Sequence, residues 1–376
     1  MNDYSIFASA LPGFENVTQS ELARLGIPMA ESTAGGVTFR GGLREMLTAT
    51  VWSRTISHVL CRIGSFQATK LPELRRKAAV LPWCDFISPQ LAVNVRATCH
   101  RSRLYHSDAV AQRVEQAITD VIPGVVACAD DDCIQVAVRM QDDQCTVSMD
   151  VASTPLHRRG YRLRTAKAPL AEHIAAATLL WLDWKTDEPL ADPMCGSGTF
   201  GIEAACFARA IPSVAYAQRL SAHRWPIWRQ GIFDEVLASR AQTVSECDIH
   251  VSDHTRGAVD ATRENAARAG VSDALHIECR PLQNLELLRP SGLLVCNPPY
   301  GQRIGNVRKL AALYADLGRL MSTTLRGWRL AVVTANPRLA RNVGLRWDRV
   351  SDTIPHGGLR VRVYHAPAAR RSWDCR

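Results

Sequence analysis

The chain has 376 residues, which is enough for two or three domains with cores of their own. Hydrophobic residues make up 47% of it, and no uninterrupted apolar run of about 18 residues occurs, so the composition excludes a disordered chain and predicts no membrane span. The formal net charge of +9 suits a polyanionic partner, although solubility alone also permits it.

The N-terminal sequence and the pattern of cysteines indicate the cellular compartment in which the protein is expected. Asp3 stands near the start and no basic stretch precedes an apolar one, so no secretory signal is predicted. The 12 cysteines are scattered without a Cys-x-x-Cys pair, and several lie in apolar runs (Cys61, Cys247, Cys279 and Cys296). We therefore expect reduced core thiols in the cytoplasm, with neither a metal site nor a disulfide framework.

The first 65 residues show the pattern of a small α+β unit. Strands are predicted at residues 4–9, 36–41 and 57–63, and helices at residues 18–26 and through Leu47. The unit has no cluster of chemically active residues, so we expect a scaffold or a lever for RNA docking. The next unit, to about residue 155, is predicted to have strands at 91–97, 134–139 and 145–150 and a helix at 108–119.

A glycine loop opens the third part of the chain. A short apolar strand, Leu190–Ala191, precedes the loop, and a helix follows it at residues 201–208. Gly196 and Gly198 can adopt backbone angles closed to other residues, and the amides at the start of a helix can receive an anionic group. The loop consists of Asp192, Pro193, Met194, Cys195, Gly196, Ser197, Gly198 and Thr199.

The surroundings of this loop favour one ligand. A phosphate loop of an NTPase needs a lysine near its end, and none is present. A dinucleotide site needs an acid about 20 residues further on, and no Asp or Glu occurs between Glu203 and Asp234. The remaining interpretation is a loop beneath the methionine moiety and ribose of S-adenosylmethionine, with Asp253 ending the next strand. The alternative is a small-residue turn used only for helix packing.

A second motif lies about a hundred residues after the loop. The apolar run Leu293–Cys296 ends in Asn297, Pro298, Pro299 and Tyr300, which must lie at the carboxyl end of a strand, where open α/β sheets bind ligands. If the Asn297 amide oxygen and the Pro298 carbonyl each accept one hydrogen of a base amine, its nitrogen can aim a lone pair at a methyl group. Tyr300 can stack on the extruded base. The alternative is a Pro-Pro turn with a packed tyrosine.

The remaining elements frame these motifs. An alanine-rich helix at 169–180 carries Glu172 and His173 as possible cofactor contacts. Trp225, in an aromatic and arginine-rich insertion, is expected to be a buried anchor. Further predicted elements are helices at 257–270 and 309–321, strands at 274–279 and 328–334, a short helix from Pro337, and a hairpin of 347–353 with 359–365 around 356–358.

The two motifs together resemble those of the amino-methyltransferases that act on RNA bases. Within these, the chain resembles the bacterial 23S rRNA guanine-N2 methyltransferases, which carry a THUMP RNA-binding domain before the catalytic domain. The resemblance runs almost end to end and includes Phe7-Ala8-Ser9, Gly13-Phe14-Glu15, Gly35-Gly36-Val37-Thr38-Phe39, Trp52-Ser53-Arg54 and Leu156-His157-Arg158-Arg159-Gly160-Tyr161-Arg162.

This resemblance implies an α/β fold. A Rossmann-like, seven-stranded methyltransferase domain at 156–376 would follow a ferredoxin-like domain at 1–65 and a THUMP domain at 66–155. The implied cofactor is S-adenosylmethionine, held by Asp192–Thr199, Asp253, His254, Leu282 and Asn297. The sequence departs from the family pattern at Pro281, where relatives have an Asp that accepts the adenine amine, so adenine would be held by the main chain near Leu282 or by Gln283.

The implied partner is RNA. Candidates for phosphate contact in the second unit are Arg96, His100, Arg101 and Arg103, for which a solvated strand end is nearly as good an interpretation. The basic run after it adds Arg158, Arg159, Tyr161, Arg162 and Arg164, with Lys167 beyond, and a smaller basic pair, Arg370 and Arg371, lies near the end. We expect a monomer or weak homodimer.

The sequence thus predicts a methyltransferase that forms N2-methylguanosine, with 23S rRNA as the favoured substrate. Rival interpretations are the same reaction on tRNA, methylation of adenine N6 in RNA, and a catalytically weak RNA-binding assembly factor. Some relatives carry a second methyltransferase module. This chain shows no second glycine loop, so we expect a single activity.

Overall fold

The computed structural model describes residues 3–130, 133–152, 154–164, 169–240, 247–300 and 307–369, so Lys167, Arg370 and Arg371 lie outside the described residues. The chain forms two compact units. The first comprises Met1–Ala10, Thr18–Arg158 and Pro212–Arg240, and the second comprises Leu11–Val17, Arg159–Ile211 and Ala241–Arg376.

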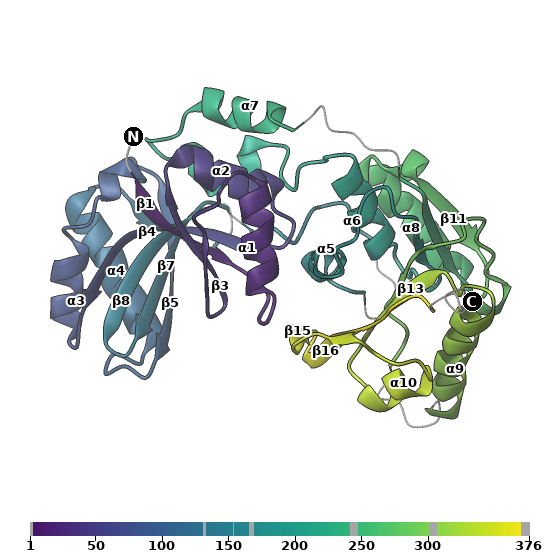
Figure 1. Ribbon diagram of the computed structural model, residues 1–376. Coiled ribbons are helices and arrows are strands. Elements are labelled where there is room, and N and C mark those ends of the chain that lie inside the picture. The colour runs from purple at the N-terminus through teal and green to yellow at the C-terminus, as the bar shows by residue number, and fades with distance from the viewer. Residues whose placement is uncertain are drawn as a thin grey trace. The chain divides into compact units, whose positions relative to one another are not determined.

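The first unit is built on one mixed sheet with the strand order β2-β3-β1-β4-β8-β7-β5-β6 (Figure 1). The antiparallel pairing of β4 with β8 joins the two predicted N-terminal domains into this one sheet. The strands are β1 (Tyr4–Ser9), β2 (Glu31–Thr33), β3 (Gly36–Gly41), β4 (His58–Gln67), β5 (Ala92–His100), β6 (Val126–Ala127), β7 (Ile134–Gln141) and β8 (Gln144–Asp150). The helices are α1 (Glu15–Arg24), α2 (Leu43–Trp52), α3 (Leu71–Ala78), α4 (Ser107–Val121) and α7 (Gln230–Ala238).

The residues of the insertion at 212–240 belong to this first unit, which differs from the predicted domain limits. Trp225 is buried there, as predicted, and its ring packs edge-on against Phe86 with the ring centroids 5.1 Å apart. The Trp52 indole Nε1–H donates to the Val236 carbonyl of α7 at 2.7 Å. Aromatic contacts thus hold the insertion to the N-terminal unit.

The cysteine prediction needs two corrections. Cys128 and Cys133 form a disulfide, although reduced thiols were expected throughout. Cys279 is exposed because it is the last residue of an edge strand, whereas Cys61 and Cys296 are buried as predicted. Burial raises the pKa of the Cys61 thiol to about 12, so it is an unreactive core group.

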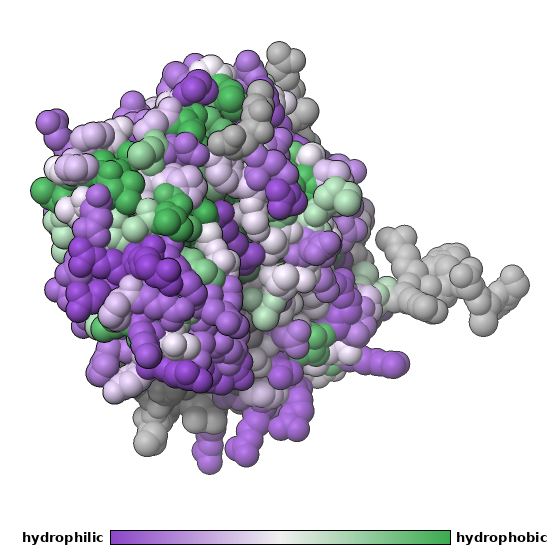
Figure 2. Space-filling view, turned by 90° about the vertical axis from the view of Figure 1, so that its left-hand side faces the viewer, coloured by the Kyte–Doolittle hydropathy of each residue, from purple (hydrophilic) through white to green (hydrophobic). Residues whose placement is uncertain are grey.

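Hydrophilic side chains make up most of the surface shown in Figure 2, with smaller hydrophobic patches between them. Among the described residues, no helix combines the length and the apolar character needed to cross a bilayer.

The second unit is built on a sheet whose main path is β11-β10-β9-β12-β13-β16-β14, with β15 paired to β16. The first five of these strands are parallel, and β16 is antiparallel to β13. The strands are β9 (Leu190–Asp192), β10 (Ile249–Asp253), β11 (Leu275–Cys279), β12 (Gly292–Cys296), β13 (Trp328–Thr334), β14 (Arg349–Val350), β15 (Ile354–His356) and β16 (Leu359–Ala366). The helices are α5 (Glu172–Trp181), α6 (Thr199–Ala208), α8 (Arg256–Ala269), α9 (Val307–Thr323) and α10 (Pro337–Asn342).

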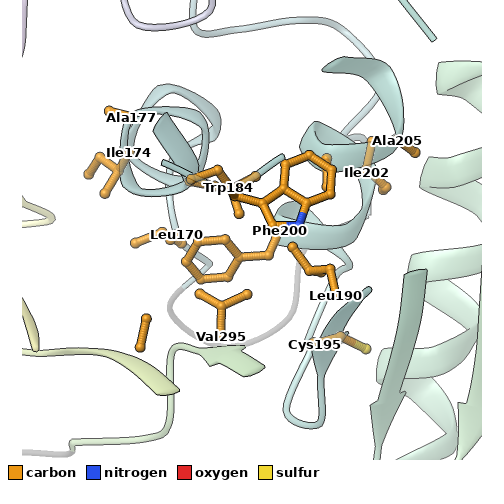
Figure 3. Packing of buried hydrophobic residues seen from close by; sticks show 14 of the residues in the cluster. Leu170, Ile174, Ala177, Trp184, Leu190, Cys195, Phe200, Ile202, Ala205 and Val295 are labelled. Carbon is orange, nitrogen blue, oxygen red and sulfur yellow. The ribbon is translucent and has the colours of Figure 1, made fainter. Parts of the chain in front are cut away.

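The side chains of β12 alternate between the two faces of the sheet, and each face packs against a layer of helices. Leu293 and Val295 face one core cluster with the residues of α5 and α6, and Leu294 and Cys296 face a second cluster with the residues of α9. In the first cluster the Phe200 ring of α6 lies among Leu190, Val295 and Trp184 (Figure 3). The glycine loop, which ends where α6 begins, therefore stands on a packed apolar base.

The strand order places the switch point of the sheet between β9 and β12. The chain proceeds from β9 outward to β10 and β11, then returns to add β12 on the other side of β9. In open α/β sheets, ligands bind outside the carboxyl ends of the strands at such a point. The terminal hairpin differs from the prediction, since β15 pairs with β16 around Gly357 and Gly358, and residues 347–353 contribute only the short β14.

Candidate cofactor and methyl-transfer site

The glycine loop has the backbone that its sequence requires. Gly196 has φ +56° and Gly198 has φ +85°, which are both left-handed values that favour glycine. Gly198 is also the residue that caps the N-terminus of α6. A Cβ atom on Gly198 would lie 2.6 Å from Cγ2 of Thr262, so this position excludes any side chain.

Hydrogen bonds fix the loop from two neighbouring elements. The Gly196 amide donates to Oδ2 of Asp253 at 3.1 Å, which joins the loop to the end of β10. From α8, the Thr262 hydroxyl donates to the Gly196 carbonyl at 3.1 Å, and Nδ2 of Asn265 donates to the Ser197 carbonyl at 3.0 Å. The loop is thus held in shape by the protein itself.

Thr262 and Asn265 were not among the residues predicted from the sequence. Both are fully buried, although they lie on the amphipathic helix α8. A signal was available, because two polar residues three apart lie on the apolar face of that helix and so need buried partners.

Asp253 ends β10, as predicted, and its carboxylate is buried. Oδ1 accepts the Thr255 amide at 2.9 Å and the Thr255 hydroxyl at 2.7 Å, in addition to the Gly196 amide on Oδ2. His254 is largely exposed, with Nδ1 3.2 Å from Oδ1 of Asp253. The carboxylate is therefore positioned rigidly beside the glycine loop.

Asp192 is a buried carboxyl group at the end of β9. Burial raises its pKa to about 8; the Met194 amide, which donates to Oδ1 at 3.2 Å, opposes this rise, and nearby Asp253 adds to it. An acid held this way is most stable as a carboxylate when a cation lies next to it.

Asn297 follows β12 at the same edge of the sheet. The register pairs Leu294 with Ala191, so Asp192, which ends β9, and Asn297, which follows β12, lie at the carboxyl ends of adjacent parallel strands. Oδ1 of Asn297 is buried and accepts no hydrogen bond from the described residues. A buried carbonyl oxygen that accepts no hydrogen bond lowers the free energy of unfolding by roughly 1–3 kcal/mol. Such an oxygen is explained if a bound ligand donates a hydrogen bond to it.

The rest of this motif is partly packed. Pro298 is buried, Pro299 is exposed, and Tyr300 is half-buried against both core clusters. Burial raises the pKa of the Tyr300 hydroxyl, so the ring stays neutral. The exposed part of this ring leaves an aromatic surface at the strand edge.

The segment at the predicted adenine position has its own interactions. Pro281 is exposed and opens a short 3-10 helix, Leu282–Asn284, in which Leu282 is buried. Nε2 of Gln283 donates to Oδ2 of Asp316 on α9 at 2.8 Å. This bond uses one of the two amide hydrogens, and the amide oxygen is the group that can accept from an adenine amine.

The basic run requires corrections to three predicted RNA contacts. Tyr161 is buried, and its hydroxyl donates to Oε1 of Glu203 at 3.1 Å. The Arg159 side chain is 4% exposed, with Nε 3.7 Å from the same carboxylate. Arg162 donates to Oε2 of Glu172 at 2.7 Å and is mostly buried. The two arginines neutralise buried acids and Tyr161 donates a hydrogen bond to one of them, because a buried carboxylate needs a partner.

The other predicted RNA contacts are exposed. Arg96 and His100 lie on β5, and Arg101 and Arg103 pair with Asp142 and Asp143 in the turn that follows β7. From the basic run, Arg158 and Arg164 are exposed. RNA contact by these residues stays a prediction.

Three possible metal ligands lie together at the other end of the sheet. The donor atoms of Asp248, His250 and His276 are all within 4.8 Å of one another, and Arg289 donates to the remaining oxygen of Asp248 at 2.9 Å. They stand at the amino ends of β10 and β11, so they are not part of the site around Asp253 and Asn297.

A parallel sheet with a glycine loop after β9, an acid at the end of β10 and Asn-Pro-Pro-Tyr after β12 defines an S-adenosylmethionine-dependent methyltransferase. Comparison with known families gives the particular one: the RMKL-like methyltransferase domain matches residues 159–356, and the RlmL ferredoxin-like domain matches residues 5–60. The chain belongs to this RMKL-like methyltransferase family. The expected fold class and cofactor are thereby confirmed.

Individual relatives agree with this placement. Ribosomal RNA large subunit methyltransferase K/L of Syntrophotalea carbinolica is 35% identical over 97% of this chain, and the match covers 54% of that protein. The chain thus spans about half the length of the K/L relatives. A candidate RNA methyltransferase of Synechocystis is 29% identical, with 94% of both chains covered. The crystal structure of SMU.472 in complex with SAH superimposes with a TM-score of 0.88 at 25% identity, covering 99% of this chain and all of that one.

Proposed function

We propose that the chain methylates the exocyclic N2 of a guanine in RNA, with 23S rRNA as the favoured substrate. The observation that carries this proposal is the buried Oδ1 of Asn297, which accepts no hydrogen bond from any described residue, at the edge of the sheet next to the glycine loop. The names of the K/L relatives support a large-subunit rRNA substrate.

The residues present fit the cofactor. The loop leaves no room for a Cβ at Gly198, its Ser197 hydroxyl is buried with no partner among the described residues, and Asp192 is a buried acid suited to a cation. Asp192, Gly196 and Asp253 would hold the methionine and ribose ends. When bound there, S-adenosylmethionine supplies an electrophilic methyl group.

The chain's own residues then prepare the nucleophile. An aromatic amine is a weak nucleophile because its lone pair is delocalised into the ring. Oδ1 of Asn297 and the Pro298 carbonyl each accept one amine hydrogen, which favours the pyramidal nitrogen. Tyr300 receives the extruded base by stacking. Positioning contributes most of the rate, because no strong base is needed before the methyl group moves.

The pKa of Asp192 gives a pH dependence. Below pH 8 the free protein holds this carboxyl mostly protonated, whereas the cationic cofactor favours the carboxylate, so binding releases a proton. We expect the affinity for S-adenosylmethionine to rise towards tenfold per pH unit between about pH 6 and 7, a range in which an α-amino group stays mostly protonated. Isothermal titration measures this rise. The Asp192→Asn variant should bind S-adenosylmethionine more weakly, and its affinity should not change with pH over this range. A flat profile in the unchanged protein would show that Asp192 does not face the cofactor.

The test of the function is to identify the methylated nucleoside. The purified chain is incubated with S-adenosylmethionine carrying a deuterated methyl group and with rRNA or tRNA from a strain that lacks the gene, and the digested nucleosides are analysed by mass spectrometry. We expect labelled N2-methylguanosine from 23S rRNA. Label in N2-methylguanosine from tRNA would show that the substrate is tRNA. Label in N6-methyladenosine would show that the methylated base is adenine and not guanine. Cofactor binding without any label would favour an RNA-binding assembly factor.

A further inference from the structure

The first unit contains a broad trough that the predicted function does not use. Its volume is about 1010 Å³, and it lies on the face of the sheet formed by β1, β4, β8, β7 and β5. Residues from both predicted N-terminal domains line it, including Phe7 and Arg62 from the ferredoxin-like part and Arg96 and Arg139 from the following part. The ferredoxin-like part, expected to be a scaffold or a lever for RNA docking, thus contributes residues to a shared surface.

The strand register shows that these side chains share one face. Cα partners run across the sheet from Arg96 through Ala137 and Ser148 to Arg62 and Ser5. Because paired residues project to the same side, Arg96 and Arg62 lie in one row, three strand spacings or roughly 14 Å apart.

Arg139 lies on the same face in the adjacent row. It is paired with Thr98 on one side and with Thr146 on the other. It stands two residues along β7 from Ala137, which places it roughly 7 Å from the first row. Three guanidinium groups are therefore spread over the trough in a triangle.

The trough is positively charged. Of the described residues that line it, Arg62, Arg96 and Arg139 are basic and only Asp142 is acidic, and Asp142 is paired with Arg101 at 3.0 Å. The pKa of Arg62 is lowered by burial and by the charge of Arg139. These arginines repel one another, so an anion between them would relieve that repulsion.

The trough also offers a stacking platform. The Arg62 guanidinium lies over the Phe7 ring, 5.0 Å from its centroid. Planar guanidinium groups and aromatic rings are the groups on which unpaired bases stack. Around them, hydroxyl and amide side chains such as Ser65, Thr146 and Gln144 can bond to sugars and base edges.

We propose that this trough binds a single-stranded segment of RNA, with the phosphates on the three arginines and a base stacked at Arg62 and Phe7. An open sheet of four strands with aromatic residues holds two or three unpaired bases in known RNA-binding modules, and five strands line this trough. A duplex would present only its backbone and shallow groove to this face, and its bases could not reach the platform. The proposal rests on the proposed RNA substrate and adds to it the form of RNA that the N-terminal unit recognises.

The test is RNA binding by the full chain with the arginines removed. Fluorescence anisotropy is measured with a labelled single-stranded RNA of about 12 nucleotides and with the same strand in a duplex. In Arg96→Gln/Arg139→Gln, two exposed charges are lost. We expect at least a tenfold loss of affinity for the single strand, and a slope of log K against log salt that is shallower by about 1.4, or 0.7 for each phosphate contact. Arg62→Lys keeps the charge but loses the planar group, so it should weaken binding while the salt slope stays the same.

The matched control is Arg24→Gln/Arg76→Gln, which removes two exposed charges from α1 and α3 outside the trough. Thermal melting checks that all variants are folded. Equal binding by the trough variant and the control, or tighter binding of the duplex, would overturn the proposal even if methyl transfer to RNA is confirmed. Conversely, the trough variant could lose single-strand binding selectively while the unchanged chain methylates no RNA. That result would support RNA binding by the trough and contradict the proposed methyl transfer.

Discussion

Replacing Asn297 by alanine is expected to lower the rate of methyl transfer by about 100- to 1000-fold, which is the usual effect of removing one preorganised hydrogen-bonding group from an active site. The affinity for S-adenosylmethionine should stay nearly the same, because the glycine loop and Asp253 keep their own hydrogen bonds. The effect should appear in kcat, since the Asn297 oxygen matters most as the amine becomes pyramidal.

The same substitution should not destabilise the free protein. Oδ1 of Asn297 is buried without a donor among the described residues, so its removal relieves a desolvation cost. A melting temperature that is unchanged or slightly raised, together with lost activity, is typical of a residue kept for function at some cost in stability.

Asn336 provides the matched control. Its Oδ1 caps α10 by accepting the amides of Arg338 at 3.0 Å and Leu339 at 3.2 Å. Asn336→Ala should therefore cost about 1 kcal/mol of unfolding free energy and leave methyl transfer unchanged. If Asn297→Ala behaves in the same way as Asn336→Ala, then Asn297 is structural and the proposed role of the motif is wrong.

The position of the site could be predicted because strand ends are marked in the sequence. Glycines after Ala191 and prolines after Cys296 end two apolar runs abruptly, and parallel strands bring their carboxyl ends to one edge of the sheet. Asp253 could be placed for the same reason, since it ends the strand that lies between β9 and the edge strand β11.

The basic run could not be interpreted correctly from the amino-acid sequence of that segment alone. Whether Tyr161 and Arg159 face solvent or the interior depends on Glu203, a buried acid more than forty residues away on α6. A linear pattern shows the charge of a segment and not the acid that neutralises it. The trough was missed for a related reason, because Arg62, Arg96 and Arg139 come together only through the pairing of β4, β8, β7 and β5.

Substitution of Gly198 by alanine is expected to remove cofactor binding and to destabilise the second unit. Two causes add: the left-handed φ of +85° costs a non-glycine residue roughly 1–2 kcal/mol, and the new Cβ would lie 2.6 Å from Cγ2 of Thr262. Forcing extra atoms into a packed site costs a further 1–3 kcal/mol or so. We therefore expect a loss of about 2–5 kcal/mol in the free energy of unfolding, measured by denaturant titration.

Two further variants separate these causes. Gly270 caps α8 with a φ of +71°, and a Cβ at this position would meet no atom of the described residues within 4 Å, so Gly270→Ala should show the backbone cost alone and keep cofactor binding. Thr262→Ser removes Cγ2 but keeps the hydroxyl that donates to the Gly196 carbonyl. Gly198→Ala/Thr262→Ser should then regain part of the stability and of the affinity for S-adenosylmethionine. If Gly198→Ala were no worse than Gly270→Ala in stability and still bound the cofactor, the close approach of α8 to the loop would have no role in shaping the site.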